Sequence, residues 1–156
     1  MSFVKAKDYI EKFGLGKNIM EFNESSATVE EAAKAIGCDG DEIGKTLSFL
    51  IGEDPILILV SGNSRIDNAK YKQEFNTKAK MIKFDQVEEL IGHAVGGVCP
   101  FGVNEGVKIY LDESLKKHNI IYPAAGSSNS AVKLTLSELE DITNYEKWVD
   151  VCKEGE

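Results

Sequence analysis

Hydrophobic positions in the first part of the chain predict helices alternating with short extended segments. Apolar residues at helical spacing predict a first helix around residues 9–13, and Ile19–Phe22 is predicted to be extended. Thr28 and Glu31 form a capping box, in which each side chain bonds the other residue's backbone N–H. A second helix is therefore predicted to begin there and to stop at Gly37.

Two apolar runs in the middle of the chain predict a β-hairpin. Lys45–Ile51 and Pro55–Ser61 have the composition of strands, and Gly52-Glu53-Asp54 between them is a turn signal. The second run is apolar on both faces, so we expect it to be a central strand of a sheet. After it, Asp67–Phe75 is predicted to be helical and Ala79–Phe84 to be a strand.

The last third of the chain continues the mixed pattern. Asp85 is predicted to cap a helix that runs to Ile91, and Thr135 with Glu138 forms a second capping box. The other predicted elements are strands at Val107–Leu111, Ile120–Tyr122 and Ala131–Leu134, and a short helix at Ser114–His118. The pattern predicts one mixed α/β domain over residues 1–156, with a curved, mostly antiparallel, barrel-like sheet surrounded by helices.

Composition narrows the class of protein without deciding its function. The chain has 156 residues, 42% of them hydrophobic and 28% charged, which is ordinary for a globular domain. No apolar run approaches the roughly 18 residues of a membrane helix, and the first residues do not resemble a signal peptide. We therefore expect a cytoplasmic protein that does not bind membranes. Cys38, Cys99 and Cys152 are odd in number and far apart, which indicates neither a disulfide framework nor a zinc site.

Charge is unevenly distributed along the chain. The net charge of −8 argues against a general nucleic-acid binder, yet residues 65–83 contain six basic and only two acidic residues. Such a patch suits a partner that presents a few phosphates at one place, such as the end of an RNA. The alternative is a solvated surface whose lysines serve solubility. The candidate RNA contacts are Arg65, Lys70, Lys72 and Lys80.

A glycine-rich loop, Gly96–Gly102, is the most distinctive feature of the sequence. Glycine lets backbone amides approach a ligand closely, and Pro100 stiffens the loop and favours an extended Cys99. Exposed N–H groups in such a loop could hold a carbonyl or carboxylate oxygen. The alternative is an ordinary connection after the helix that ends near Gly92.

Four segments in order resemble the YbaK/ProX family of aminoacyl-tRNA deacylases, which is related to the editing insertion of bacterial prolyl-tRNA synthetases. They are Gly44–Phe49, Ser61–Asp67, Val95–Gly102 and Ala125–Leu134. The resemblance extends from about Thr28 to Ile142 and implies a mixed, barrel-like fold. It also implies a hydrolase, without metal or cofactor, that removes an amino acid wrongly esterified to the 3′ end of a tRNA.

The resemblance assigns candidate roles to individual residues. Lys45 matches a lysine that contacts the phosphate of the terminal adenosine or polarises the ester. Gly96 and Gly97 match the residues whose backbone holds the ester carbonyl. The candidate substrate-binding residues are Cys99 (as a wall residue), Pro100 and Gly102, together with Gly126, Ser127, Asn129 and Ser130 of the loop that lines the amino-acid pocket.

One departure from the family leaves the substrate open. Alanine-specific members typically carry a histidine where this chain has Ser130. The side chains of residues 124–130 are small apart from Asn129, which predicts a compact pocket for alanine, serine, cysteine or another amino acid no larger than about threonine. The expected substrate is a mischarged tRNA, with tRNA-Pro as the candidate and prolyl-tRNA synthetase as a candidate partner.

Two other functions are compatible with the sequence. The same pocket could recognise an aminoacyl-tRNA or a synthetase without catalysing a reaction, and Lys45 with the paired glycines favours the enzyme. A thiol hydrolase would use Cys99 as nucleophile and His93 as base. That mechanism needs the thiol to be activated by a nearby imidazole or helix N-terminus, and nothing in the sequence gives the direction of His93.

Overall fold

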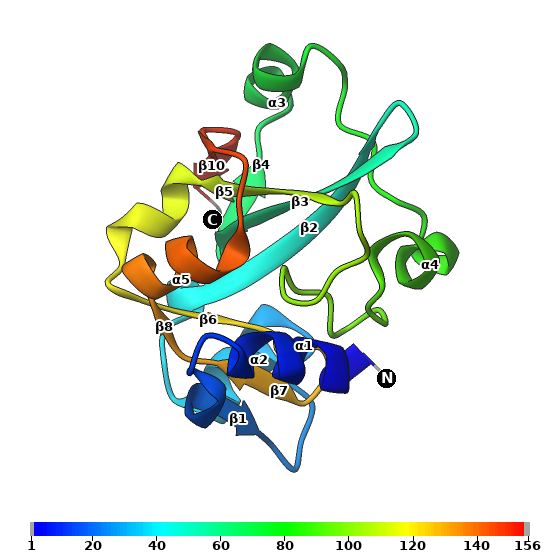
Figure 1. Ribbon diagram of the computed structural model, residues 1–156. Coiled ribbons are helices and arrows are strands. Elements are labelled where there is room, and N and C mark those ends of the chain that lie inside the picture. The colour runs from blue at the N-terminus through cyan, green and yellow to red at the C-terminus, as the bar shows by residue number, and fades with distance from the viewer. Residues whose placement is uncertain (1, 155–156) are drawn as a thin grey trace.

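A curved mixed sheet of six strands forms the centre of the computed structural model, which describes residues 2–154 (Figure 1). In sheet order the strands are β8 (Leu134–Thr135), β6 (Ile120–Pro123), β2 (Ile43–Ile51), β3 (Asp54–Ser61), β5 (Lys108–Asp112) and β9 (Trp148–Val149). The pairs β2–β3 and β6–β8 are antiparallel, and β2–β6, β3–β5 and β5–β9 are parallel. The expected mixed α/β class with a curved sheet is confirmed.

The β2–β3 hairpin is the longest ladder of the sheet and gives it its core. Eight residue pairs join the strands, from Gly44–Ser61 to Ile51–Asp54. Residues 56–60 of β3 are each at most 1% exposed, because β2 and β5 flank the strand and other elements cover both its faces. The prediction of a hairpin with a central second strand is therefore confirmed.

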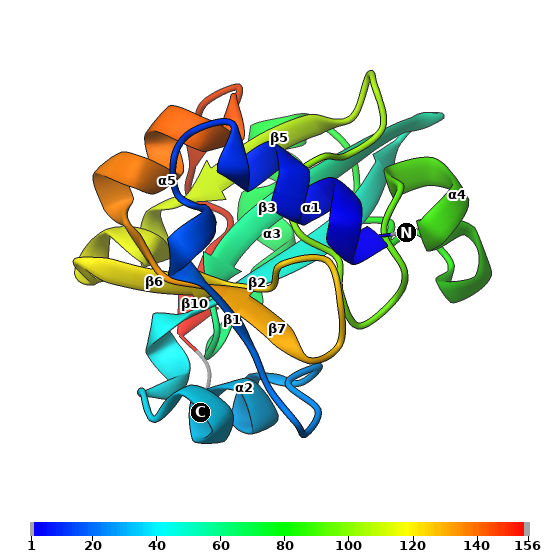
Figure 2. The ribbon, with the colours of Figure 1, turned by 60° about the horizontal axis from the view of Figure 1, so that its bottom comes forward.

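Helices cover both faces of the sheet. On one face, α1 (Ser2–Glu11) and α5 (Leu136–Thr143) pack on Leu59 and Leu111, with α1 lying across the sheet in Figure 2. On the other face, α3 (Asn68–Phe75) buries Tyr71 against Phe49. The remaining helices are α2 (Val29–Ile36) and α4 (Val87–Ile91), and the 3₁₀ helices are η1 (Gly16–Asn18), η2 (Gly40–Glu42), η3 (Phe84–Gln86) and η4 (Glu113–Lys117).

Two short antiparallel pairs complete the fold. β1 (Ile19–Glu21) pairs with β7 (Ser130–Val132), and β4 (Ser64–Ile66) pairs with β10 (Cys152–Glu154). Both pairs join segments far apart in the sequence, and the second brings the C-terminal strand next to the end of the hairpin. Within residues 2–154, no helix is long and apolar enough to cross a membrane.

The predicted helix starts are confirmed at the two capping boxes, but not at Asp85. Thr28 and Thr135 both accept from the backbone N–H three residues later, and the reciprocal glutamate bonds complete both capping boxes. Gly37 ends α2 in the left-handed conformation. The Asp85 cap is wrong, because Asp85 lies inside η3 and α4 begins only at Val87 without a side-chain cap.

The strand predicted at Ala79–Phe84 does not form. The segment makes one bridge to β2, between Met81 and Phe49, with the backbone bonds Leu50 N–H to Lys80 O (2.8 Å) and Ile82 N–H to Ser48 O (3.1 Å). After Ile82 the chain turns into η3 instead of following β2. Ile82 is the one buried residue of this segment and lies between exposed neighbours.

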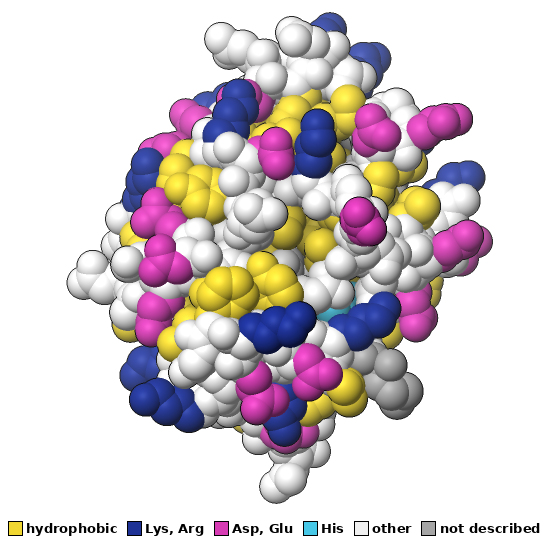
Figure 3. Space-filling model, in the orientation of Figure 1, with side chains coloured by type: hydrophobic (Ala, Val, Ile, Leu, Met, Phe, Trp, Pro, Cys, Tyr) yellow, Lys and Arg dark blue, Asp and Glu magenta, His cyan; other side chains and the backbone are white. Residues whose placement is uncertain are grey.

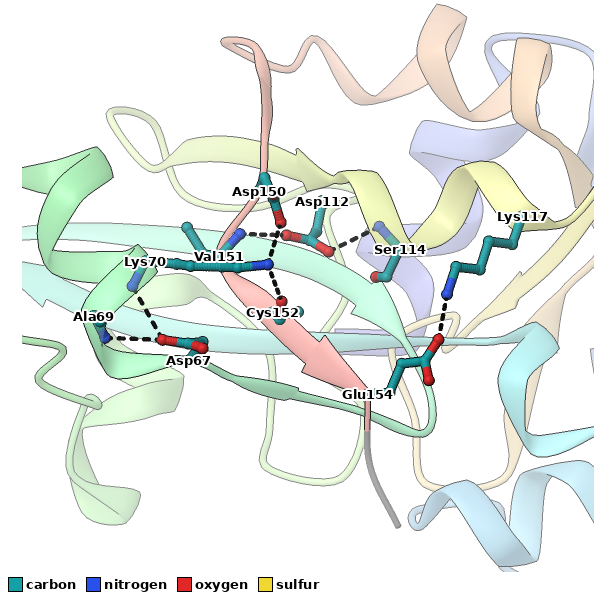
Figure 4. Close-up of polar contacts among 10 residues, drawn as sticks. All are labelled: Asp67, Ala69, Lys70, Asp112, Ser114, Lys117, Asp150, Val151, Cys152 and Glu154. Carbon is teal, nitrogen blue, oxygen red and sulfur yellow. Dashed lines mark hydrogen bonds and ion pairs between the residues drawn. The ribbon is translucent and has the colours of Figure 1, made fainter.

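A buried carboxylate attaches the C-terminal segment to the sheet (Figure 4). Asp112 is 1% exposed and accepts from the backbone N–H groups of Val151 and Ser114, each at 2.9 Å. Nearby, Lys70 donates to the Asp150 carboxylate (3.1 Å) and to the Cys152 carbonyl (3.0 Å). These contacts hold β10 in place beside β4.

We expect Asp112→Ala to lower the free energy of unfolding by roughly 2–4 kcal/mol, because a buried N–H group (Val151) and a partly buried one (Ser114) lose their acceptor, and each loss costs about 1–3 kcal/mol. Urea unfolding followed by circular dichroism measures the change. Asp150→Ala is the matched control, since its ion pair with Lys70 is exposed and worth at most about 1 kcal/mol. Equal losses in the two variants would contradict the role given to Asp112.

Candidate functional site

A cavity of about 410 Å³ opens beside β2, on the side away from β3. Its walls come from five segments far apart in the sequence: the start of α2, the strand β2, the chain leading into α4, the first part of the glycine loop, and Ala124 after β6. The lining residues are Ser26, Ala27, Thr28, Val29, Ala32, Ile43, Gly44, Lys45, Thr46, Ser48, Met81, Ile82, Phe84, Val87, Val95, Gly96, Val98 and Ala124.

The edge of β2 is unpaired where it meets this cavity. β6 pairs with β2 only at Ile43 and Gly44, and the segment around Ile82 joins it only from Ser48 onward. Backbone groups of a strand point alternately to its two sides, so the N–H and C=O of Thr46 point away from β3. Among residues 2–154 no strand partner covers them there. We call this stretch, Lys45–Leu47, the open edge of β2.

Thr46 also offers a side-chain group. Its hydroxyl oxygen is buried and has no hydrogen-bond partner within the described residues. A buried polar group usually finds a partner, so an unbonded hydroxyl on a cavity wall is a candidate ligand contact. The sequence analysis did not identify Thr46 as a site residue. What distinguishes Thr46 is its position on an unpaired strand edge, and a threonine in a strand is not unusual in itself.

Lys45 lines the same cavity and is half-buried. Its Nζ donates to the backbone carbonyl of Ser64 at 2.7 Å, which directs the ammonium toward β4. Burial lowers the pKa of Lys45 from its ordinary value of 10.5, and the nearby Arg65 lowers it further. An ammonium has three N–H groups, and within residues 2–154 that of Lys45 makes this one hydrogen bond, so two N–H groups remain for a ligand.

The two neighbouring glycines of the loop have different surroundings. Gly96 lines the cavity with φ +94°, a conformation that other residues rarely adopt. A Cβ on Gly97 would lie 2.5 Å from the backbone of Gly126 and Ser127. A side chain at Gly97 would therefore collide with that loop, and Gly97 lines a second cavity, of about 690 Å³, together with Gly126 and Ser127.

The remaining loop residues lie in the core and not in the cavity wall. Cys99 is fully buried, Pro100 is buried as well, and a Cβ on Gly102 would lie 2.7 Å from the Lys5 carbonyl of α1. Cys99, which the sequence suggested as a wall residue of the pocket, does not line this cavity. The loop turns inward after Val98, because its apolar residues complete the core beneath α1.

Cys99 and His93 do come together, in a form unsuited to catalysis. Cys99 Sγ lies 3.6 Å from His93 Nε2, and both residues are 0% exposed. His93 Nε2 lies 2.5 Å from the Phe101 carbonyl, which can only accept, so Nε2 carries the proton and cannot take one from the thiol. Nδ1 then accepts from Ser2 Oγ at 2.8 Å. Burial also raises the pKa of Cys99 to about 12, which disfavours the thiolate.

The Gly126–Ser130 loop stands behind the cavity. Ser127 Oγ bonds Ser130 Oγ (2.6 Å) and Asn129 Oδ1 (2.9 Å), while Asn129 Nδ2 donates to the Phe22 carbonyl (3.0 Å). None of Gly126, Ser127, Asn129 and Ser130 is among the lining residues. The segment before α2 lines the cavity instead. Its Ser26 N–H donates to the Ser128 carbonyl, so this segment lies between the loop and the cavity.

The predicted basic contacts are spread over three elements. Arg65 lies in β4 and Lys70 and Lys72 in α3, whereas Lys80 precedes the bridge to β2. Lys70 is engaged by Asp150 and Cys152, while Arg65, Lys72 and Lys80 are exposed. None of the four lines the cavity. On the face shown in Figure 3, basic and acidic side chains are interspersed, so that face carries no continuous basic surface.

Comparison with known proteins identifies related chains. A family model described as the aminoacyl-tRNA editing domain matches residues 23–142. "Uncharacterized protein YwhH" of Bacillus subtilis (strain 168) is 43% identical over 157 residues, covering 100% of both chains. A proline–tRNA ligase of Streptococcus sanguinis (strain SK36) is 29% identical over 109 residues, which are 69% of this chain and 17% of the ligase.

A solved structure agrees with the sequence comparison. The crystal structure of a protein proposed to be a trans-editing enzyme for prolyl-tRNA synthetase superposes with a TM-score of 0.87 at 31% identity, over 97% of each chain. The curved sheet and the surrounding helices are thus shared along almost the whole chain. The match to YwhH extends over the whole chain. It therefore includes every segment that lines the cavity.

We expect the stability of the fold to decrease below about pH 6.5 because of His93. Burial lowers the pKa of this histidine below its ordinary value of 6.5. In the window between the lowered and the ordinary pKa, the unfolded chain binds a proton that the folded chain does not, so unfolding becomes easier as pH falls. Urea unfolding at several pH values between about 7.5 and 5 measures the effect.

The two histidines of the chain provide a matched pair of variants for this test. His93→Gln should remove part of the decrease in unfolding free energy, because the titrating group is gone. His118→Gln should keep it, since His118 is partly exposed near the protein surface. An identical pH dependence in the wild type and His93→Gln would show that His93 does not contribute.

Proposed function

The chain belongs to the aminoacyl-tRNA editing domain family, and we propose that it hydrolyses the ester between a small amino acid and the 3′ end of a mischarged tRNA. One observation carries this proposal: Lys45, a glycine with positive φ and an unpaired strand edge line the same cavity. Its volume of about 410 Å³ lies in the range of pockets that hold small ligands.

The groups around the cavity suit hydrolysis of an activated ester. In this reaction a water oxygen adds to the carbonyl carbon, the carbonyl oxygen gains negative charge, and the bond to the ribose oxygen breaks as that oxygen takes a proton. The Thr46 N–H, on the unpaired edge of β2, can donate to the oxygen that becomes charged, and the positive charge of Lys45 can stabilise that oxygen or a neighbouring phosphate. Such fixed donors act most strongly in a site shielded from water.

The cavity wall supports a small amino acid as the substrate. Ala27, Gly44, Gly96 and Ala124 all contribute small side chains or none to the lining. The Gly126–Ser130 loop does not line this cavity, whereas Gly126 and Ser127 line a second cavity of about 690 Å³. Alanine, serine and cysteine are the leading candidates, and a snug wall distinguishes one methylene by only about 1–3 kcal/mol.

The relatives suggest which tRNA carries the amino acid. A match to 17% of a proline–tRNA ligase indicates that this domain also occurs within a larger synthetase. We therefore propose mischarged tRNA-Pro as the substrate and prolyl-tRNA synthetase as the partner that releases it. A free-standing editing domain would act after the mischarged tRNA has left the synthetase.

A deacylation panel tests the function and the size of the pocket together. We expect hydrolysis of more than one of alanyl-, seryl- and cysteinyl-tRNA-Pro, measured as the loss of radiolabelled amino acid, and no hydrolysis of prolyl-tRNA-Pro. Phenylalanyl-tRNA serves as the large-residue control. Binding of these tRNAs without turnover would favour the non-catalytic alternative, and efficient cleavage of prolyl- or phenylalanyl-tRNA would contradict a small pocket.

Lys45→Ala is expected to lower the rate of deacylation on the order of 100-fold, because a fixed donor in a catalytic site is worth about that much. Lys45→Met removes the charge but keeps an aliphatic side chain of similar length. Its deacylation rate should fall by a similar factor if the charge is what matters. Lys34→Ala, on the exposed surface of α2, is the control. Near wild-type rates in a folded Lys45→Ala variant would remove Lys45 from the mechanism.

A further inference from the structure

Exposed hydrophobic side chains gather at the mouth of the cavity. Five large hydrophobic residues are exposed among residues 2–154, and three of them line this cavity. They are Met81, Phe84 and Val95, with exposed fractions of 60%, 76% and 43%. We call these three residues the rim patch. An apolar patch beside a pocket often marks a binding surface.

Folding does not explain the exposure of Phe84. The segment is attached to β2 by two backbone hydrogen bonds and by the side chain of Ile82, which is 5% exposed. Phe84 follows at the start of η3 and leaves most of its ring in solvent. An aromatic ring that buries so little surface gains little free energy from the fold, so a ligand is the better reason for its position.

The charge around the rim patch indicates the chemistry of that ligand. From Phe75 to Phe84 the chain contains three lysines and no acidic residue, in a protein of net charge −8. Lys78, Lys80 and Lys83 are all exposed. An exposed aromatic ring next to lysines matches a nucleotide, whose base stacks on the ring while its phosphates meet the cations. A purely apolar partner would leave these lysines without a role.

Acidic residues limit the direction from which a polyanion can arrive. Asp85 follows Phe84 directly, and Glu88 and Glu89 are exposed on α4. The phosphates of a bound strand are therefore favoured on the side of Lys80 and Lys83 and disfavoured over α4.

We propose that Phe84, with Met81 beside it, is the platform on which the terminal base of the tRNA stacks, and that Lys80 and Lys83 contact the phosphates next to it. This inference rests on the proposed function, because it places the base at the mouth while the esterified amino acid lies deeper, near Lys45 and Gly96. The rim patch then holds the substrate by its 3′ nucleotide, whatever the amino acid is.

Fluorescence of a modified RNA tests the platform without any hydrolysis. The probe is an RNA hairpin with a single-stranded CCA end in which 2-aminopurine replaces the terminal adenine, since stacking quenches this base. We expect the wild type and Phe84→Trp to quench it on binding. Phe84→Leu, which keeps an apolar side chain but has no ring, should lose the quenching and bind roughly tenfold more weakly.

Two further variants make the test specific. Phe13→Leu removes an exposed aromatic ring that does not line the cavity, so it should leave quenching and affinity unchanged. Lys83→Ala should weaken binding and lower the slope of log affinity against log salt by about one, as expected for one lost phosphate contact. Thermal unfolding shows whether each variant keeps the wild-type stability.

The outcomes separate the platform from the hydrolase. Loss of quenching in Phe84→Leu supports the platform even if no tRNA in the panel is deacylated, in which case only the hydrolase is refuted. The platform is overturned if the wild type fails to bind the hairpin, or if Phe84→Leu still quenches the probe. It is also overturned if Phe84→Leu changes only the sedimentation of the protein, since the rim patch would then be a contact between copies of the chain.

Discussion

The incomplete pairing of one edge of β2 is the constraint on which the site depends. A strand inside a sheet normally has both edges bonded, and β2 is bonded on both sides at Gly44 and again at Ser48. β6 leaves the ladder after Pro123. The segment containing Ile82 reaches the strand only further along. Between β6 and the Ile82 segment, the backbone N–H and C=O of Thr46 have no strand partner among residues 2–154. The cavity lies next to this unpaired stretch of β2.

The position of Lys45 depends on contacts that begin far from the cavity. Its ammonium bonds the carbonyl of Ser64 in β4, and β4 is paired with the C-terminal strand β10. That strand is held in turn by Asp112, which bonds the backbone of Val151 (Figure 4). A lysine side chain is flexible, so a fixed acceptor reduces the freedom it would lose on binding a ligand. The C-terminal segment therefore belongs to the support of the site.

The chemistry proposed for this cavity needs donors and a shaped wall more than a nucleophile. Within residues 2–154, one thiol and one imidazole lie close enough to suggest nucleophilic catalysis, those of Cys99 and His93. Both are fully buried in the core. His93 instead bonds Phe101 and Ser2, so it ties the end of the glycine loop to α1. An ester of a ribose hydroxyl is already reactive, and oriented backbone groups can supply much of the remaining stabilisation.

Local patterns in the sequence determined the elements whose signals lie within a few residues. The capping boxes at Thr28 and Thr135, the β2–β3 hairpin and the burial of β3 follow from short-range hydrogen bonding and apolar runs. The resemblance to a family gave the fold and drew attention to Lys45 and the glycine loop. Tertiary structure decided the rest, because contacts such as Gly97 with Gly126, or Lys70 with Asp150, join distant segments. For the same reason only the folded chain shows that Cys99 is buried and that the mouth of the cavity is lined by Phe84.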